Sequence, residues 1–133
     1  MTDLELIKTA IEARKRAYAP YSGFSVGAAL LTADGRVFMG CNIENAAFTP
    51  TNCAERTAFF KAVSEGVRAF EAIAVVGGKG EEPSEFCAPC GVCRQVMAEF
   101  CSHDFRIVLG NEKNQTVYTL SELLPASFSK SDL

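Results

Sequence analysis

The chain has 133 residues, of which 48% are hydrophobic and 22% are charged, with a formal net charge of -3, which suits one domain over residues 1–133. The acidic balance and the lack of a basic stripe disfavour nucleic acid as a partner, and no apolar run is long enough to span a bilayer. The charged N-terminus has no signal-peptide core, so we expect a cytoplasmic protein.

The first predicted element is an amphipathic helix over residues 3–18, in which apolar side chains recur every three or four positions. Arg14 interrupts its apolar stripe, and we expect the aliphatic stem to lie along the stripe with the charged head in water. After a break at "APYSGF", residues 24–31 and 37–43 are predicted strands. The Asp-Gly pair between them indicates a β-hairpin.

Helices and strands alternate along the rest of the chain. Helices are predicted at residues 53–66, 90–100 and 121–125, and strands at 72–76, 105–109 and 116–120. This order favours one mixed sheet with helices on its faces. Because strands 72–76 and 105–109 flank one helix, we expect them to be parallel with a right-handed crossover. The two core helices then begin at the same edge of the sheet, where their N-termini can meet.

Three of the six cysteines have the spacing of a metal site. In a chain without an export signal, clustered thiols stay reduced and more often bind metal than form disulfides. Cys90 and Cys93 face one side of a first helical turn, and Cys53 adds a third sulfur from the other helix. Three ligands leave one tetrahedral position open, as a catalytic zinc site requires, whereas a structural site uses a fourth ligand.

Glu55 and Arg56 share the first turn of the helix that begins at Cys53. Side chains there tilt toward the helix N-terminus, so the Glu55 carboxylate can lie beside a zinc-bound water without binding zinc. It can take a proton from that water and deliver it to a substrate nitrogen. Three thiolates leave Zn²⁺ with an excess negative charge, which Arg56 and the helix N-termini can reduce through hydrogen bonds and their positive ends.

These residues resemble the small cytidine deaminases, the homotetrameric family that acts on free nucleosides. The resemblance follows "YSGFSVGAAL", "GCNIENAAF", "CAERTAFFKAV", "PCGVCRQVMAEF" and the tail "LLPASF", nearly the whole chain in order. The pattern is that of zinc deaminases with three cysteine ligands and a glutamate that binds no metal. It implies a three-layer α/β fold, with a mixed five-stranded sheet between helices on both faces, and one Zn²⁺ per chain.

The resemblance also implies roles for single residues. It assigns the zinc ligands and the proton shuttle to Cys53, Cys90, Cys93 and Glu55. Phe24 would stack on the pyrimidine, and Asn42 and Glu44 would hydrogen-bond the ribose hydroxyls. Phe128 resembles the C-terminal aromatic that closes a neighbouring subunit's site, in a homotetramer with shared active sites. Phe48 is a departure, because many relatives carry Tyr at that position.

Less specific interpretations of the same residues are also open. The three cysteines could be buried structural thiols or hold a structural zinc. Since "CAPCGVC" is C-x-x-C-x-x-C, Cys87 could belong to an iron–sulfur cluster, but the ferredoxin cysteine before a proline is absent, and a spare loop thiol is the simpler interpretation. Without the resemblance, Phe24 could be plain core packing, Asn42 and Glu44 a solvated turn, and Arg56 a surface charge.

The sequence as a whole predicts a zinc hydrolase that converts cytidine and deoxycytidine to uridine and deoxyuridine with release of ammonia, a reaction of pyrimidine salvage. The close alternative is a deaminase of the same fold that acts on another cytosine-bearing compound, such as blasticidin S. "NIEN" and the C-terminal Phe favour nucleosides. An alternative of another class is a non-catalytic metal or iron–sulfur module. The expected partners are a small nucleoside and further copies of the chain, with neither nucleic acid nor membrane.

Overall fold

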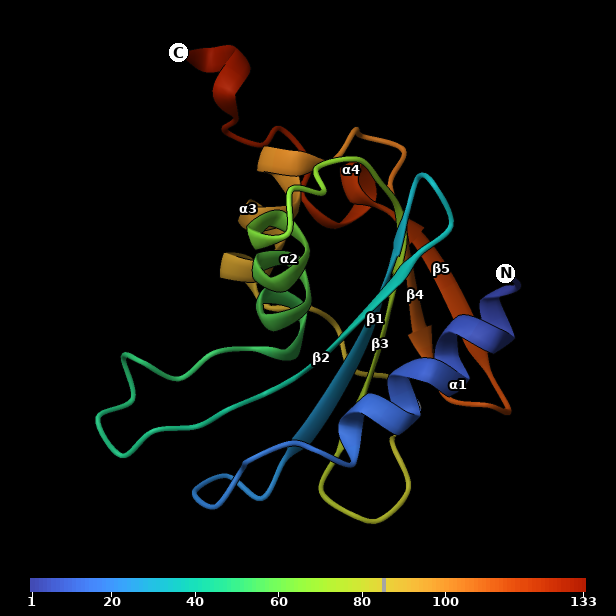
Figure 1. Ribbon diagram of the computed structural model, residues 1–133, viewed down its shortest axis with the longest axis vertical. Coiled ribbons are helices and arrows are strands. Elements are labelled where there is room, and N and C mark those ends of the chain that lie inside the picture. Colours follow the sequence, from blue (N-terminus) through green and yellow to red (C-terminus); the bar gives the residue numbers. More distant parts are fainter. Residues whose placement is uncertain (85) are drawn as a thin grey trace.

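The computed structural model describes residues 1–84 and 86–133. A five-stranded sheet in the order β2-β1-β3-β4-β5 forms its centre (Figure 1). The elements are α1 (Asp3–Arg14), β1 (Ser25–Thr32), β2 (Val37–Cys41), α2 (Ala54–Ser64), β3 (Phe70–Gly78), α3 (Gly91–Phe100), β4 (Arg106–Gly110), β5 (Gln115–Thr119), α4 (Leu120–Leu123) and the 3₁₀ helix η1 (Lys130–Asp132). The pair β3–β4 is parallel and the other three pairs are antiparallel. The predicted mixed sheet is therefore confirmed.

Helices cover both faces of this sheet. Successive side chains of a strand point to opposite faces. Ala28 and Leu30 of β1 accordingly join the core beneath α2 and α3, whereas Ala29 and Leu31 join the core beneath α1. The α2 side is centred on Phe59, which is fully buried. The arrangement is the predicted three-layer α/β fold.

Two glycines let helices lie directly on the strands. A Cβ atom at Gly27 of β1 would lie 2.1 Å from the carbonyl oxygen of Ala10 in α1. One at Gly40 of β2 would lie 2.3 Å from the carbonyl oxygen of Ala54, the first residue of α2. Such distances exclude any side chain at these positions without a shift of backbone. The N-terminus of α2, which carries the first of the clustered cysteines, is thereby fixed against β2.

The first helix is shorter than predicted, because it ends at Arg14 and not at residue 18. The amide of Tyr18 donates to the carbonyl of Asn42 at 2.9 Å, and the Tyr18 carbonyl accepts from the amide of Glu44 at 2.8 Å. Tyr18 therefore pairs with the segment after β2, and its side chain is 56% exposed. Tertiary hydrogen bonds override the helical pattern here.

The placement of the Arg14 head in water was also wrong. The side chain is only 8% exposed. Its guanidinium donates to backbone carbonyls of β1, β3 and the turn after β3. A guanidinium offers five donors in a fixed fork, so several carbonyls can satisfy it when water is excluded.

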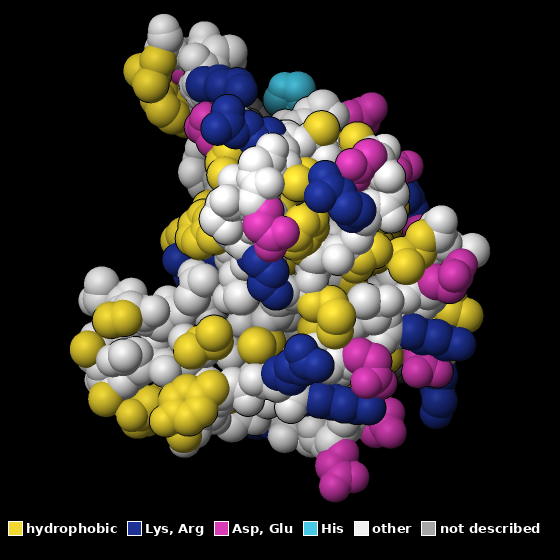
Figure 2. Space-filling view, viewed as in Figure 1, with side chains coloured by type: hydrophobic (Ala, Val, Ile, Leu, Met, Phe, Trp, Pro, Cys, Tyr) yellow, Lys and Arg dark blue, Asp and Glu magenta, His cyan; other side chains and the backbone are white. Residues whose placement is uncertain are grey.

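The C-terminal tail has more structure than its composition predicts. No element is predicted for residues 126–133, which have little apolar surface, yet η1 is present, and the amide of its N-cap residue Ser129 donates to Asp132 Oδ2 at 2.9 Å. The tail stands away from the body of the molecule in Figures 1 and 2. Within the described residues, no helix has the length and apolar character needed to cross a membrane.

Candidate active site

The three predicted metal ligands meet where α2 and α3 begin. The Sγ atoms of Cys53 and Cys90 lie 3.8 Å apart, those of Cys90 and Cys93 lie 3.6 Å apart, and all three lie within 4.8 Å of one another. Sulfurs that share one tetrahedral zinc through bonds of about 2.3 Å lie about 3.8 Å from each other. The donor set therefore fits zinc, and it leaves one coordination position to a water or substrate.

Local backbone geometry frees these sulfurs for a metal. Cys53 and Cys90 are the N-cap residues of α2 and α3, both in extended conformation, and neither side chain caps its own helix. The positive ends of two helices thus converge on the sulfurs, which favours thiolates. Hydrogen bonding from Cys93 and from Arg56 lowers the pKa of the Cys53 thiol to about 5.

Arg56 points back at the sulfurs from the first turn of α2. Its Nη2 donates to Cys53 Sγ at 3.3 Å. Among the side chains that the structure describes, its Nε is a buried nitrogen without a hydrogen-bond partner. The hydrogen bond to Cys53 raises the pKa of Arg56, so the guanidinium stays charged beside the ligands. Arg56 is therefore not the exposed surface charge of the simpler interpretation.

Glu55 is buried next to the cysteine cluster. Its side chain is 4% exposed. Burial raises the pKa of this carboxyl to about 7, and the negative charge of Cys53 contributes in the same direction. A carboxyl with that pKa exists in both protonation states near neutral pH, so it can accept a proton and also donate one.

The Phe24 ring and the Cys87 thiol share the space beside Gly77 at the end of β3. A Cβ atom at Gly77 would lie 3.0 Å from Phe24 Cε1 and 2.7 Å from Cys87 Sγ. Burial raises the pKa of Cys87 to about 11, and the nearby Glu55 carboxylate adds to that shift. Cys87 is absent from the cysteine group that could hold a metal. It is a loop thiol as predicted, but its place beside Phe24 was missed.

The side chain of Asn42 is buried and holds the start of β1. Its Oδ1 accepts from the Val26 amide at 2.8 Å, and its Nδ2 donates to the Phe24 carbonyl at 2.8 Å. Asn42 thus fixes the backbone on both sides of Ser25, the residue that follows Phe24. It is not part of a solvated turn.

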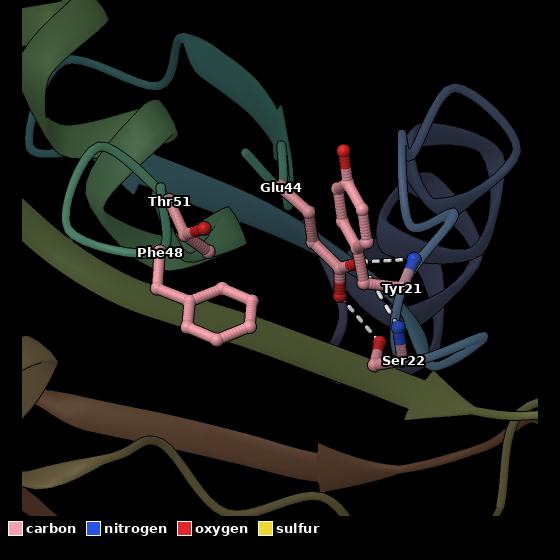
Figure 3. Close-up of a pocket in the computed structure, with 5 residues that line it drawn as sticks. All are labelled: Tyr21, Ser22, Glu44, Phe48 and Thr51. Atoms are coloured by element: carbon pink, nitrogen blue, oxygen red, sulfur yellow. Dashed lines mark hydrogen bonds between the residues drawn. The ribbon is translucent and has the colours of Figure 1, made fainter. Parts of the chain in front are cut away.

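Glu44 is held by the loop before Phe24, as Figure 3 shows. Its carboxylate accepts from the amides of Tyr21 and Ser22 at 2.9 and 3.1 Å, and from the Ser22 hydroxyl. The Ser22 hydrogen bonds lower the pKa of Glu44, so it is a fixed negative charge.

An open cavity of about 450 Å³ lies beside Glu44 and is also lined by Tyr21, Ser22, Phe48 and Thr51 (Figure 3). Sequence reasoning missed Tyr21, Ser22 and Thr51 as lining residues. For Tyr21 and Ser22 the available signal was the position of "PYSG" directly before the predicted base-stacking residue Phe24. Phe48 is 72% exposed and has a positive φ of 60°, so its ring is presented at the tip of a tight turn.

Phe128 does not join the other predicted residues within its own chain. It is 61% exposed, and its carbonyl accepts from Gln95 Nε2 at 2.8 Å. In Figure 1 the tail leaves the molecule at the end opposite to the loop that enters α2. The structure therefore brings together the three cysteines, Glu55 and Arg56, and leaves Phe128 apart from them.

Comparisons with known proteins agree with this geometry. Residues 1–110 match the model of the family described as the cytidine and deoxycytidylate deaminase zinc-binding region. A cytidine deaminase of Sporosarcina psychrophila is 55% identical over 130 residues, which are 97% of this chain and 93% of the relative. A crystal structure of cytidine deaminase from Burkholderia pseudomallei superposes with a TM-score of 0.88 at 51% identity, covering 96% of this chain and 100% of that one.

A more distant relative bears on the alternative substrate. A blasticidin-S deaminase of Bacillus cereus is 30% identical over 132 residues, 96% of this chain and 93% of the relative. The greater similarity to cytidine deaminases favours the nucleoside branch. With the zinc-spaced sulfurs, the buried carboxyl and the family match together, the chain belongs to the family of cytidine and deoxycytidylate deaminases with this zinc-binding region.

Proposed function

We propose that this protein is a zinc-dependent hydrolase that deaminates cytidine and deoxycytidine to uridine and deoxyuridine and releases ammonia. The observation that carries the proposal is the pairing of three sulfurs at zinc spacing with a buried carboxyl that is not one of the ligands. Zinc held by Cys53, Cys90 and Cys93 would lower the pKa of a water at the open position and so make it a nucleophile near neutral pH.

Glu55 moves the protons of this reaction. It takes a proton from the attacking water and delivers it to N3 of the pyrimidine while the water oxygen bonds to C4. It then carries the second proton of the water to the amine, the bond from C4 to nitrogen breaks, and ammonia leaves. A pKa of about 7 suits a group that must both accept and donate in one cycle.

Phe24, Asn42 and Glu44 hold the nucleoside. The Phe24 ring offers a face for stacking on the base. Asn42 retains a second amide hydrogen and a second lone pair beyond its two backbone bonds, and the Glu44 carboxylate retains a lone-pair site beyond its three. These free positions can serve ribose hydroxyls. Phe48 supplies an apolar edge without the hydroxyl of the more usual Tyr.

The working enzyme is a homotetramer with shared sites, each protomer being one domain over residues 1–133. Two observations support this: Phe48 and Phe128 are exposed by 72% and 61%, and the cavity beside Glu44 is open. Figure 2 shows hydrophobic side chains gathered over the projecting loop at lower left. Ile43 and Phe48, in the segment between β2 and α2, are exposed. A neighbour that covers them would exclude water from the base. We place the enzyme in cytoplasmic pyrimidine salvage.

An ultraviolet assay against cytidine, deoxycytidine, cytosine, cytidine monophosphate and blasticidin S, with metal analysis of the same sample, tests this function. We expect about one zinc per chain and turnover of both nucleosides. Cytidine monophosphate should be rejected, because Glu44 is a fixed negative charge and "GCNIENAAF" has no Arg or Lys to receive a phosphate. Preferred turnover of blasticidin S would support the alternative, and a brown protein that contains iron would rule out the zinc site.

A further inference from the structure

The end of α1 carries a buried cation that the proposed reaction does not use. The guanidinium of Arg14 donates to four backbone carbonyls. Nε bonds that of Ser25 at 2.9 Å, Nη1 bonds that of Glu81 at 2.9 Å, and Nη2 bonds those of Gly78 and Gly80 at 2.7 and 2.5 Å. No carboxylate forms a salt bridge with it within the part of the chain that the structure describes. Its burial is therefore supported by backbone carbonyls alone.

These four carbonyls belong to two segments that meet at the base pocket. Ser25 follows Phe24 directly, and Gly78 follows Gly77, the residue against which the Phe24 ring and the Cys87 thiol lie. The loop after β3 also folds back on this point, since both the amide and the hydroxyl of Ser84 donate to the Gly77 carbonyl at 2.7 and 2.6 Å.

The backbone around Phe24 is held from two directions. On the β2 side, Asn42 bonds the Phe24 carbonyl and the Val26 amide. On the α1 side, Arg14 bonds the carbonyl between them, that of Ser25. Ser25 pairs with Gly78 at the end of the β1–β3 ladder, and the Arg14 guanidinium bonds the carbonyls of these same two residues. It therefore braces the end of the ladder beside which Phe24 and Gly77 lie.

We propose that Arg14 is a positioning residue for the base pocket: its guanidinium fixes the Phe24 ring against the end of β3 without touching the substrate. The inference rests on the proposed function, in which Phe24 stacks on the pyrimidine. Shape matters here more than charge. The planar fork reaches four carbonyls at once, whereas the ammonium of Lys is a point charge with three donors.

The test compares Arg14→Lys and Arg14→Gln with Arg16→Lys, a matched change at an exposed arginine two residues further on. Zinc content, steady-state kinetics with cytidine and backbone amide exchange are measured. Both Arg14 variants should keep zinc and lose about tenfold to a hundredfold in kcat/KM, mainly through KM, because the ring is misplaced. Amide exchange should become faster in residues 22–28 and 77–84 and stay unchanged in α2. Arg16→Lys should match the parent protein in all three measurements.

A double-mutant cycle with Phe24→Ala decides whether Arg14 acts through the ring. If it does, Arg14→Lys should add little to the rise in KM already caused by Phe24→Ala. Additive effects, unchanged exchange in residues 22–28, or a loss of zinc and fold in both Arg14 variants would overturn the proposal. If the parent protein does not deaminate cytidine, the proposed function fails, and the exchange pattern still tests the role of Arg14.

Discussion

The metal-binding sulfurs and the residues expected to hold the nucleoside are neighbours, but they are built differently. Cys53 and Cys90 begin two helices that lie on the sheet, and Cys93 is 1% exposed. Glu44 and Phe48 lie in loops around an open cavity, and Phe48 is 72% exposed. Metal chemistry is thus supported by rigid elements of one chain. The cavity for the substrate is open in one chain, and the proposed second copy would therefore be needed for activity but not for metal binding.

Loss of a metal-binding sulfur should have the largest effect of the changes considered, because it removes the metal site itself. We expect Cys90→Ala to lose zinc and nearly all activity and to lower the melting temperature, because the metal ties two helices together. Cys87→Ala is the matched control, since its thiol lies three residues away but outside the metal group, and it should retain about one zinc per chain. Metal analysis and thermal unfolding report both results. A fully loaded Cys90→Ala protein would exclude Cys90 as a ligand.

Loss of the Glu55 carboxyl should leave zinc binding intact and strongly slow deamination. We expect Glu55→Gln to keep zinc and fold and to lower kcat by about 10² to 10⁴, the range of general acid–base catalysis. Glu65→Gln, at the exposed end of the same helix, should have no effect. Steady-state kinetics with cytidine measure kcat for both variants. If Glu55→Gln remained within about tenfold of the parent, another group would have to move the protons.

Loss of the Arg56 guanidinium should slow the reaction less. Without its hydrogen bond, Cys53 pushes more negative charge onto the zinc and weakens it as a Lewis acid. We expect Arg56→Gln to bind zinc and to lose about tenfold to a hundredfold in kcat, as is usual for groups that hydrogen-bond metal ligands. Arg56→Lys, which keeps the charge but not the fork, should be intermediate. A rate equal to that of the parent would show that the guanidinium has no influence on the metal.

Loss of the Phe128 ring should have the smallest effect, and this effect should be limited to substrate binding and turnover. We expect Phe128→Ala to raise KM or lower kcat by roughly tenfold, as misplacing a bound substrate does, with zinc content unchanged. Phe128→Tyr should restore most of the activity because it keeps the ring. Light scattering at the assay concentration gives the oligomeric state. A monomer with full activity would contradict the shared site. It would mean that one chain builds both the metal site and the substrate site.

The local features of this protein can be predicted from short stretches of its sequence. Helix and strand types, the Asp-Gly hairpin, and the positions of Cys53, Cys90 and Cys93 at helix starts all follow from short-range spacing. The parallel pairing of β3 and β4 also followed, since a strand–helix–strand unit allows few arrangements. From these, the meeting of the three sulfurs could be predicted.

Features that depend on partners distant in the chain could not be predicted in this way, because the fold brings those partners together. Tyr18 leaves the helical pattern because its amide and carbonyl pair with Asn42 and Glu44. Arg14 is buried because residues 78–81 bring three carbonyls to it across 64 or more positions. Cys87 and Phe24 both lie against Gly77, and Phe24 does so because β1 and β3 are adjacent. Periodicity and spacing describe which face a residue takes in its own element, but not which groups the fold brings to that face.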